Sequence, residues 1–446
     1  MEYRHRNKIK GELNIMGMNK KEIEYYKSLG IDTTADAFKK YKKAGWLKEI
    51  DEAFIDEVKA YWKKHYRIDV DPLLHIAYMN YTGKKEPRLI HNKISWNQVI
   101  PFFNDQEMNE SYKEKNLYDK LIPAERAAKA VIKRAHGLYF DHQNNCLDES
   151  DALNEMLSFK EDFIVKPSNT NNGQGIKKIY YRDGFLYFDD KELTMRALEK
   201  LYGGNFSVQK VVQQHTIMSD PHPDSVNTLR MITFRWKGEV RYLLTFARFG
   251  ANNNVLDNTS HGGVSIGVKD NGEFMDKALD RSFKIHDTHP TTGFPFKDME
   301  PIPNFDKFKQ YVIDLHKNIL HHDFVSWDIV VGSDGLPVFL EANFKGGTWF
   351  YQLLSEKPLF GDLTEEVLAY MYKERNNKKS PRHKSYAKLQ PTQKKQNKRI
   401  KKLEDEKEEL IKERDQFKKE YNKMKRSTSW KITAPVRKVS SILKRK

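Results

Sequence analysis

The chain has 446 residues, of which 78 are Lys or Arg and 62 are Asp or Glu, and it contains a single cysteine. One cysteine excludes a disulfide framework, and the absence of any run of about 18 apolar residues excludes a membrane-spanning helix. The first residues, MEYRHRNKIKGELNIMG, show no charged-then-apolar leader. We therefore expect a cytoplasmic protein, and the length is typical of about two or three domains.

The net charge of +16 is concentrated near the C-terminal end. Residues 375–446 hold 26 Lys and Arg against 8 Asp and Glu, whereas the other 374 residues hold 52 against 54. A nearly neutral body with a basic tail indicates an appended anchor for an anionic surface, so nucleic acid is not expected as a partner.

Helices are predicted first. Residues 1–105 form a helical N-terminal region, because KKEIEYYKSLG and IDEAFIDEVKAYWKKHY carry apolar residues at three- and four-residue steps. The same periodicity predicts helix through LIPAERAAKAVIKRAHG. Asp and Ser at the start of DESDALNEML are typical of a helix N-terminus.

From residue 163 the pattern changes to short strands. The candidates are DFIVKP, IKKIYYRDGFLYF, NFSVQKVVQ, LRMITFRW and EVRYLLTFARFG, with Arg-Asp-Gly and Lys-Gly-Glu as hairpin turns. A helix, FDKFKQYVIDLHKNIL, then precedes a last hairpin, WDIVVGSDGLPVFLEAN. This order predicts an α+β fold with antiparallel hairpins rather than alternating parallel units.

Three segments are predicted beyond residue 372. Residues 373–398 read as a basic flexible linker, and 399–426 as a coiled-coil helix or a single solvated helix, since six of eight heptad core positions are apolar. Residues 427–446 form a basic amphipathic segment that suits an anionic membrane surface, or a frayed tail, because Pro435 limits the helix.

The stretch 164–176, IVKPSNTNNGQGI, is a candidate phosphate loop. It matches neither the Walker pattern nor the dinucleotide glycine pattern. Pro167 favours an extended Lys166 at the end of a strand, and the small polar residues that follow can turn backbone N–H groups toward an anion. A surface hairpin loop with a solvated lysine is the alternative.

Oxygen ligands cluster in the last hairpin. Glu341 and Asn343 are two residues apart, so on a strand they face the same side, and Asp328 lies on the preceding strand. Such a set suits Mg²⁺ together with substrate phosphates. Isolated hairpin carboxylates are otherwise solvated, but apolar flanks favour a cation here. The adjacent His321 and His322 are predicted as solvated or packed rather than as metal ligands.

Together these motifs resemble the ATP-grasp superfamily. SVNTLR, ARFG, the DN and GG of LDNTSHGG, and WDI with EAN look more narrowly like the sugar-transfer-associated ATP-grasp family of bacterial polysaccharide clusters. The resemblance covers about residues 110–370 and implies an ATP-grasp catalytic domain over 106–372. The tail likewise resembles those of bacterial surface-polysaccharide glycosyltransferases.

The resemblance implies roles for individual residues. Lys166 contacts the ATP phosphates, Lys120 is the second phosphate lysine, and Arg230 faces the γ-phosphate or the acceptor. The remaining implied positions are the covering loop with Ser168, Gly173 and Gly175, the adenine hinge Gln209, Lys210 and Val211, the acceptor pocket Arg248, Asn258, His261, Gly262 and Gly263, and the Mg²⁺ ligands Asp328, Glu341 and Asn343. Glutamines stand where many relatives carry an acidic hinge residue, which puts the ribose contact in doubt.

The implied activity is ATP- and Mg²⁺-dependent joining of a carboxylate to an amine through an acylphosphate, during capsule, exopolysaccharide or cell-wall glycan synthesis. A kinase acting on a sugar, glycan or small molecule is one alternative. A nucleotide-binding scaffold for glycosyltransferases is another. Expected partners are a carboxylate and an amine substrate, with the tail engaging the cytoplasmic membrane face, a second coiled coil or a glycosyltransferase.

Overall fold

The structure is a computed structural model that describes residues 18–170, 175–252 and 262–380, with seven single residues beyond them (382, 406, 413, 414, 416, 417 and 420). The chain divides into two units, Met1–Asn377 and Lys378–Lys446. All elements below belong to the first unit. Of the predicted linker (373–398) the structure describes residues 373–380 and 382, and of the predicted coiled coil (399–426) only six single residues; segment 427–446 lies wholly outside the described residues.

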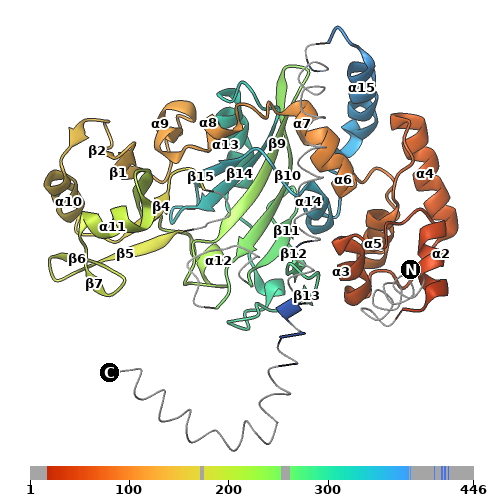
Figure 1. The fold of residues 1–446 in the computed structure, drawn as a ribbon, viewed down its shortest axis with the longest axis horizontal. Coiled ribbons are helices and arrows are strands. Elements are labelled where there is room, and N and C mark those ends of the chain that lie inside the picture. The colour runs from red at the N-terminus through yellow and green to blue at the C-terminus, as the bar shows by residue number, and fades with distance from the viewer. Residues whose placement is uncertain are drawn as a thin grey trace, which may run out of the picture. The chain divides into compact units, whose positions relative to one another are not determined.

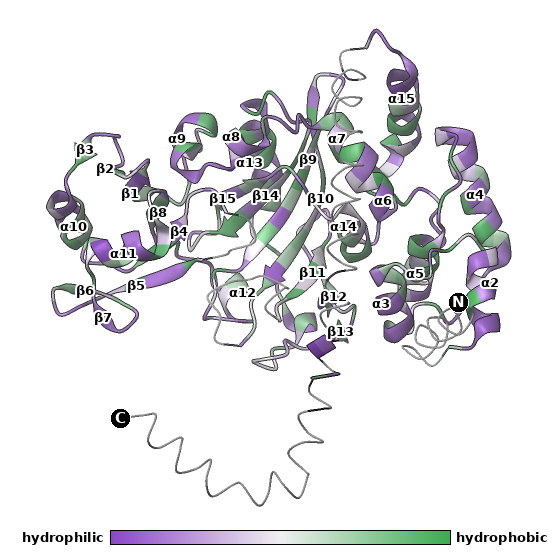
Figure 2. Cartoon of the chain, in the orientation of Figure 1, coloured by the Kyte–Doolittle hydropathy of each residue, from purple (hydrophilic) through white to green (hydrophobic). Residues whose placement is uncertain are grey.

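Short helices form the N-terminal region (Figure 1), as the apolar spacing predicted. They are α2 (Lys20–Ser28), α3 (Asp36–Ala44), α4 (Glu52–Tyr66), α5 (Leu73–Thr82), α6 (Asn92–Ile94), the π-helix η1 (Ser95–Val99) and α7 (Ile100–Phe103). Asp51 caps α4 by accepting from the Phe54 amide at 2.9 Å, and Phe54, Val58 and Trp62 form its buried stripe. α5 is mostly apolar and largely buried (Figure 2).

Three short helices, α8 (Asn109–Lys113), η2 (Lys115–Leu117) and α9 (Tyr118–Leu121), lead into an eight-stranded antiparallel sheet with the order β3-β2-β1-β8-β4-β5-β6-β7. The strands are β1 (Ala130–Ala135), β2 (Leu138–Phe140), β3 (Cys146–Leu147), β4 (Phe163–Pro167), β5 (Lys177–Arg182), β6 (Phe185–Phe188), β7 (Lys191–Glu192) and β8 (Phe206–Lys210). α10 (Glu149–Ser158) and α11 (Met195–Tyr202) pack their apolar residues into the same core.

The predicted helix through residues 121–137 is wrong. Only Leu121, the last residue of α9, is helical; residues 122–129 form no helix, and AVIKRA is strand β1. β1 pairs with β2 on one side and β8 on the other. Its β-branched Val131 and Ile132 are buried, and His136 and Gly137 both have positive φ (49° and 82°). Two such residues form the hairpin turn that matches strand twist, so tertiary pairing overrides the helix propensity of the alanines.

The second sheet is also antiparallel, with the order β13-β12-β11-β10-β9-β14-β15. Its strands are β9 (Thr228–Trp236), β10 (Glu239–Phe249), β11 (Val264–Val268), β12 (Phe274–Leu279), β13 (Ile285–His286), β14 (Phe324–Val331) and β15 (Pro337–Asn343). The predicted strands β9, β10, β14 and β15 are confirmed, whereas β11 to β13 were not predicted. Short helices α12 (Thr216–Ser219) and η4 (Phe296–Asp298) lie in its connections.

Two helices pack on this sheet. α13 (Phe305–Lys317), which the sequence predicted, contributes Phe308 and Val312 to a core that contains Met231 and Trp327. α14 (Thr348–Ser355) contacts β10 and β11. A Cβ on Gly267 of β11 would lie 2.0 Å from the Leu354 carbonyl oxygen, so only glycine permits this approach.

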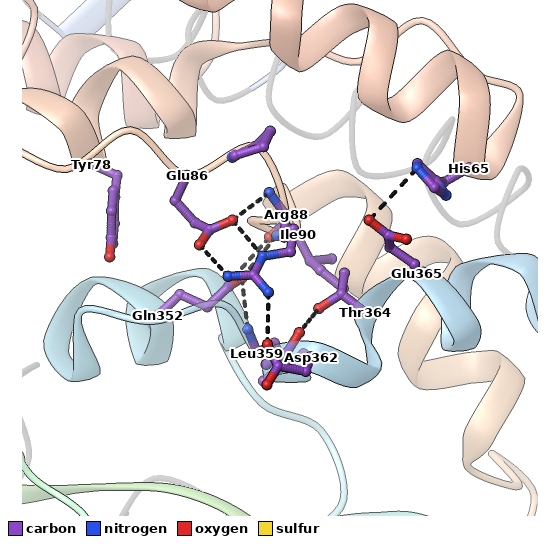
Figure 3. A network of polar contacts seen from close by, with 12 residues as sticks. His65, Tyr78, Glu86, Arg88, Ile90, Gln352, Leu359, Asp362, Thr364 and Glu365 are labelled. Carbon is purple, nitrogen blue, oxygen red and sulfur yellow. Dashed lines mark hydrogen bonds and ion pairs between the residues drawn. The ribbon is translucent and has the colours of Figure 1, made fainter.

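A polar network fastens the N-terminal region to the C-terminal helices (Figure 3). The Gln352 side chain on α14 accepts from the Ile90 amide at 2.8 Å and the Leu359 amide at 3.1 Å, and donates to the Ile90 carbonyl at 3.0 Å. Arg88 pairs with Glu86 and with Asp362 of η5 (Gly361–Leu363). The final helix α15 (Thr364–Asn376) extends into the predicted linker. Among the described residues, no helix is both long and apolar enough to cross a membrane.

Candidate functional site

One face of the second sheet carries a row of polar side chains. Glu341 on β15 lies opposite Asp328 on β14, and Asp328 lies opposite Arg230 on β9. Arg230 in turn lies opposite Phe246 on β10. Because paired residues share a face and alternate residues along a strand return to it, this register brings distant parts of the chain together on one surface.

Asp328 is the centre of this row. Both of its carboxylate oxygens contact the Arg230 guanidinium, with Nη2 donating at 2.9 Å and Nε donating more closely still. Arg248 Nη2 lies 3.2 Å from the same carboxylate, and Asn343 Nδ2 donates to it at 3.2 Å. Asp328 is only 4 % exposed, so its buried charge is compensated by two guanidinium groups.

Lys166 faces this row from the first sheet, at the end of β4, as the Lys-Pro pattern predicted. It is 4 % exposed and lines one cavity with Arg230, Asp328, Glu341 and Asn343. Burial lowers the pKa of Lys166 to about 8; Glu341 and Asp328 oppose this shift, and nearby Lys115 adds to it. A buried lysine with a depressed pKa is stabilised in its charged form by an added anion.

A second lysine, Lys115, is close to the row. Its ammonium lies 3.4 Å from the Glu341 carboxylate and donates to the Thr170 carbonyl at 2.7 Å, and the Lys115 amide donates to the Ser168 carbonyl at 2.8 Å. These bonds fix the start of the loop that follows Lys166. The Ser168 hydroxyl itself donates to Glu114 at 2.9 Å.

Lys120, the second lysine implied by the sequence, is placed elsewhere. Its side chain is 67 % exposed, and its ammonium lies 4.0 Å from Asp119. Neither Lys120 nor Lys115 is among the residues that line the cavity of Lys166, but Lys115 contacts Glu341, which lines it. The structure therefore brings Lys115, and not Lys120, into contact with the row.

The cavity has a volume of about 410 Å³ and combines a charged end with an apolar end. Ile164, Val212 and Leu340 line it beside the hinge residues Gln209 and Lys210. The ammonium of Lys210 lies 2.6 Å from Glu161, so this side chain is engaged by a neighbouring carboxylate. Val211 is not among the lining residues, and its neighbour Val212 is.

The remaining predicted positions divide into two groups. Gly173, Asn258 and His261 lie outside the described residues. Gly175 and Gly262 are described and have positive φ (76° and 94°), but neither they nor Gly263 line this cavity, whereas Arg248 does.

Several lining residues were not predicted from the sequence. They are Trp96, Ala128, Ile164, Ile176, Val212, Val226, Leu340, Lys345, Gly346, Gly347 and Tyr351. The strand period could have found one of them, because Ile164 lies two residues before Lys166. Leu340 directly precedes Glu341, so the same period places it on the opposite face; the strand pairing is irregular at this point, since Glu341 pairs with Asp328 and Phe339 with Ile329. Trp96 lies in the π-helix and Tyr351 on α14, and neither has a local signal.

The ligand set fits a hard divalent cation. Two carboxylates and one amide, from Asp328, Glu341 and Asn343, offer the oxygen donors that Mg²⁺ shares with substrate phosphates. Among the described residues, no three or more His, Cys, Asp and Glu side chains are grouped so that they alone could hold a metal ion, so the amide of Asn343 is needed to complete the set. His322 is buried and its ring stacks on Phe344, with the ring centroids 4.3 Å apart, which agrees with the packed interpretation.

Comparison with known proteins identifies a family for this chain. A family model described as sugar-transfer associated ATP-grasp matches residues 103–367, which is more than half of the chain. No curated protein matches the chain.

Three solved structures illustrate the structural matches, each with a TM-score of 0.34. The ATP-grasp ligase PsnB, complexed with minimal precursor, Mg and ADP, is 13% identical, and the match covers 61% of this chain and 62% of that one. D-alanine–D-alanine ligase from Bacillus anthracis is 14% identical over 60% and 72%. VanG D-Ala:D-Ser ligase from Enterococcus faecalis is 12% identical over 58% and 61%. The chain thus spans less than two thirds of PsnB.

Proposed function

The chain belongs to the sugar-transfer associated ATP-grasp family, and from this premise we propose that it is an ATP- and Mg²⁺-dependent ligase that joins a carboxylate to an amine. The observation that carries the proposal is the single cavity in which Lys166 from one sheet meets Arg230, Asp328, Glu341 and Asn343 from the other. Five basic residues and two carboxylates line this cavity, and such an excess of positive charge suits a polyphosphate.

ATP fits the two ends of the cavity differently. Ile164, Val212 and Leu340 form apolar walls for the adenine, and the backbone at Gln209 and Lys210 supplies hydrogen-bonding groups. Lys166 binds the α- and β-phosphates as a point charge, and the loop after it covers them. Lys115 is the better candidate for the second phosphate lysine, because it contacts both this loop and Glu341.

Asp328, Glu341 and Asn343 would hold Mg²⁺, which neutralises charge on the phosphate oxygens when it is bound. Arg230 and Arg248 pair with the Asp328 carboxylate and line the same cavity. Their guanidinium groups would stabilise the negative charge that develops on the transferred phosphoryl group. Such preorganised donors lower the barrier without a covalent enzyme intermediate.

The proposed reaction has two steps, formation of an acylphosphate and its attack by an amine. An oxygen of the substrate carboxylate attacks the γ-phosphorus, and the bond to the leaving ADP oxygen breaks, giving an acylphosphate. The amine nitrogen then attacks the acyl carbon and the carbon–oxygen bond to phosphate breaks. The products are an amide and inorganic phosphate, which takes up the proton that the amine loses.

We place this activity in the synthesis of a bacterial capsule, exopolysaccharide or cell-wall glycan. The support is the family description, sugar-transfer associated, together with the basic tail over 375–446. A tail of this charge favours the anionic cytoplasmic face of a membrane. The predicted coiled coil within the tail would mediate self-association or bind a glycosyltransferase.

Hydroxylamine tests the proposal, because it is a small amine that converts acylphosphates to hydroxamates. The full chain with MgATP, hydroxylamine and a panel of carboxylic acids should release ADP and form a hydroxamate with at least one acid, and Lys166→Ala should form none. ADP with a stable phosphoester would identify a kinase instead. Nucleotide binding without turnover across the panel would favour the scaffold.

A further inference from the structure

A second cavity adjoins the first on the same sheet face. It has a volume of about 300 Å³ and shares Arg230, Arg248, Gly347 and Tyr351 with the first cavity. Four basic residues line it, namely Lys40, Arg230, Arg248 and Arg281, and no carboxylate is among its lining residues. The second cavity therefore attracts an anion. It does so next to Arg230, which lines both cavities, and Asp328, which lines the first.

Ser265 supplies an unused hydrogen-bonding group in this second cavity. Its hydroxyl lies on β11 opposite Arg248 and is completely buried. Among the residues that the structure describes, the hydroxyl has no hydrogen-bond partner. Buried hydroxyls are normally satisfied, so a ligand atom that enters the cavity is the natural partner for Ser265.

The charges at the rim are also weakly compensated. Arg281 is exposed and forms no ion pair within the described part of the chain. Among the same described residues, Lys40 pairs only with Asp36, one turn earlier on α3, at 3.0 Å, and the Asp36 side chain is 79% exposed. An exposed pair of this kind contributes little, which leaves Lys40 able to bind an incoming anion.

Aromatic side chains form the opposite wall. Phe283, Trp349 and Phe350 line the cavity, with ring centroids 5.4 Å apart for Phe283 and Trp349 and 6.1 Å for Phe283 and Phe350. Phe283 is buried and has a φ of 66°, a conformation that costs energy for a bulky residue and persists only where packing holds it. Flat apolar faces of this kind suit the C–H face of a sugar ring.

The N-terminal region takes part in the second cavity. Lys40 comes from α3, and Tyr41 and Trp46 hold Phe283 in place with ring centroids 4.7 Å and 5.3 Å away. Lys40, Tyr41 and Trp46 lie outside the segment that the family model matches, residues 103–367. The N-terminal region therefore helps to form the second cavity, next to the first cavity, whose residues lie mostly within the matched segment.

We propose that the second cavity binds the carboxylate substrate and that this substrate is an acidic sugar, a pyranose bearing a carboxylate. Its carboxylate faces Arg230, Arg248 and the Ser265 hydroxyl. Its ring packs on Trp349 and Phe350, which are partly exposed and which the buried Phe283 supports from behind. Lys40 and Arg281 add attraction at the rim. This inference rests on the proposed function, since it names the acid that the ligase activates.

Glucuronate and glucose are matched probes, because they differ at one carbon in carrying a carboxylate or a hydroxymethyl group. Calorimetric titration of the full chain, with and without MgADP, should show glucuronate binding at least about tenfold more tightly than glucose. Arg281→Gln and Ser265→Ala should each weaken glucuronate binding by about tenfold, and Lys40→Gln by several-fold. Lys277→Gln, an exposed lysine on the neighbouring strand β12, is the control and should change nothing.

Nucleotide binding separates this inference from the proposed function. MgADP should bind Arg281→Gln and wild type equally, because Arg281 does not line the first cavity. If MgADP binds but glucuronate binds no better than glucose, or if glucose 6-phosphate alone binds, the acidic-sugar assignment is overturned. If glucuronate binds as described but MgADP does not, the ligase proposal fails and the second cavity stands.

Discussion

Asp328 and Arg230 face each other on the neighbouring strands β14 and β9, and both oxygens of the carboxylate contact the guanidinium. The pair joins the two cavities, because Arg230 lines both of them and Asp328 lines the first. Arg248 and Asn343 contact the same carboxylate, so Asp328 is held in one position where the proposed function requires a metal ligand.

Asp328→Asn should lower ATP turnover by about 100-fold or more and raise the Mg²⁺ concentration needed for half-maximal activity. The amide is a weaker ligand, and even residues that only support metal ligands typically contribute about 10- to 100-fold. Steady-state ADP release measured across a Mg²⁺ titration tests this. Asp334→Asn, in the exposed turn between β14 and β15, is the control; an unchanged Mg²⁺ requirement in Asp328→Asn would contradict the metal assignment.

The two candidate phosphate lysines can be separated by substitution. Lys115→Ala should lower ATP turnover by about 10- to 100-fold, because it removes a cation beside Glu341 and the loop. Lys120→Ala should stay within about twofold of wild type, since its side chain is 67 % exposed. Nucleotide affinity and ADP release of both variants decide the assignment, and the reverse order of effects would restore Lys120.

ATP affinity should fall as the pH rises through about 8. Burial lowers the pKa of Lys166 to about 8 in the nucleotide-free protein, and the phosphates bind its charged form. The charged fraction falls about tenfold from pH 7 to pH 9, so the apparent Kd for MgATP should rise by about the same factor. In Lys166→Arg the guanidinium stays charged over this range, and a pH dependence like that of wild type in this variant would exclude Lys166 as its source.

Gln352→Leu should destabilise the protein by at least about 1–3 kcal/mol, because it leaves the buried amides of Ile90 and Leu359 without an acceptor. Denaturant unfolding measures the loss. Gln310→Leu, on the exposed face of α13, is the matched control and should stay within about 0.5 kcal/mol of wild type. Equal stability of the two variants would mean that the network in Figure 3 does not stabilise the contact between the N-terminal region and the C-terminal helices.

Much of the second sheet could be predicted, because its strands and turns carry local signals. Lys237–Gly238, between β9 and β10, has the paired positive φ values that a two-residue hairpin requires, as does Asp183–Gly184 between β5 and β6 of the first sheet. The two-residue step from Glu341 to Asn343 likewise predicted one shared face, and both line the cavity. The short strand β11 and helix α14 carried no comparable signal, since Gly267 becomes meaningful only when the Leu354 carbonyl lies against it.

The placement of Lys115 illustrates what the sequence could not provide. Lys115 and Lys120 lie in the same short segment, and a leucine follows each within two residues. Their difference arises from contacts with Thr170 and Glu341, which lie far away in the sequence. The sequence likewise could not place Lys40 and Arg281 in one cavity, because only the folded chain brings α3 beside the turn after β12.

An isotope experiment tests the ligase reaction most directly. Glucuronate labelled with ¹⁸O in its carboxylate is incubated with the full chain, MgATP and an amine, and the phosphate released is analysed by mass spectrometry. Because the attacking carboxylate oxygen stays on phosphorus when the amine displaces phosphate, one ¹⁸O atom should appear in each phosphate, and none should appear with Lys166→Ala. Turnover that yields ADP and unlabelled phosphate, or a stable phosphoester, would contradict activation of the carboxylate in this site.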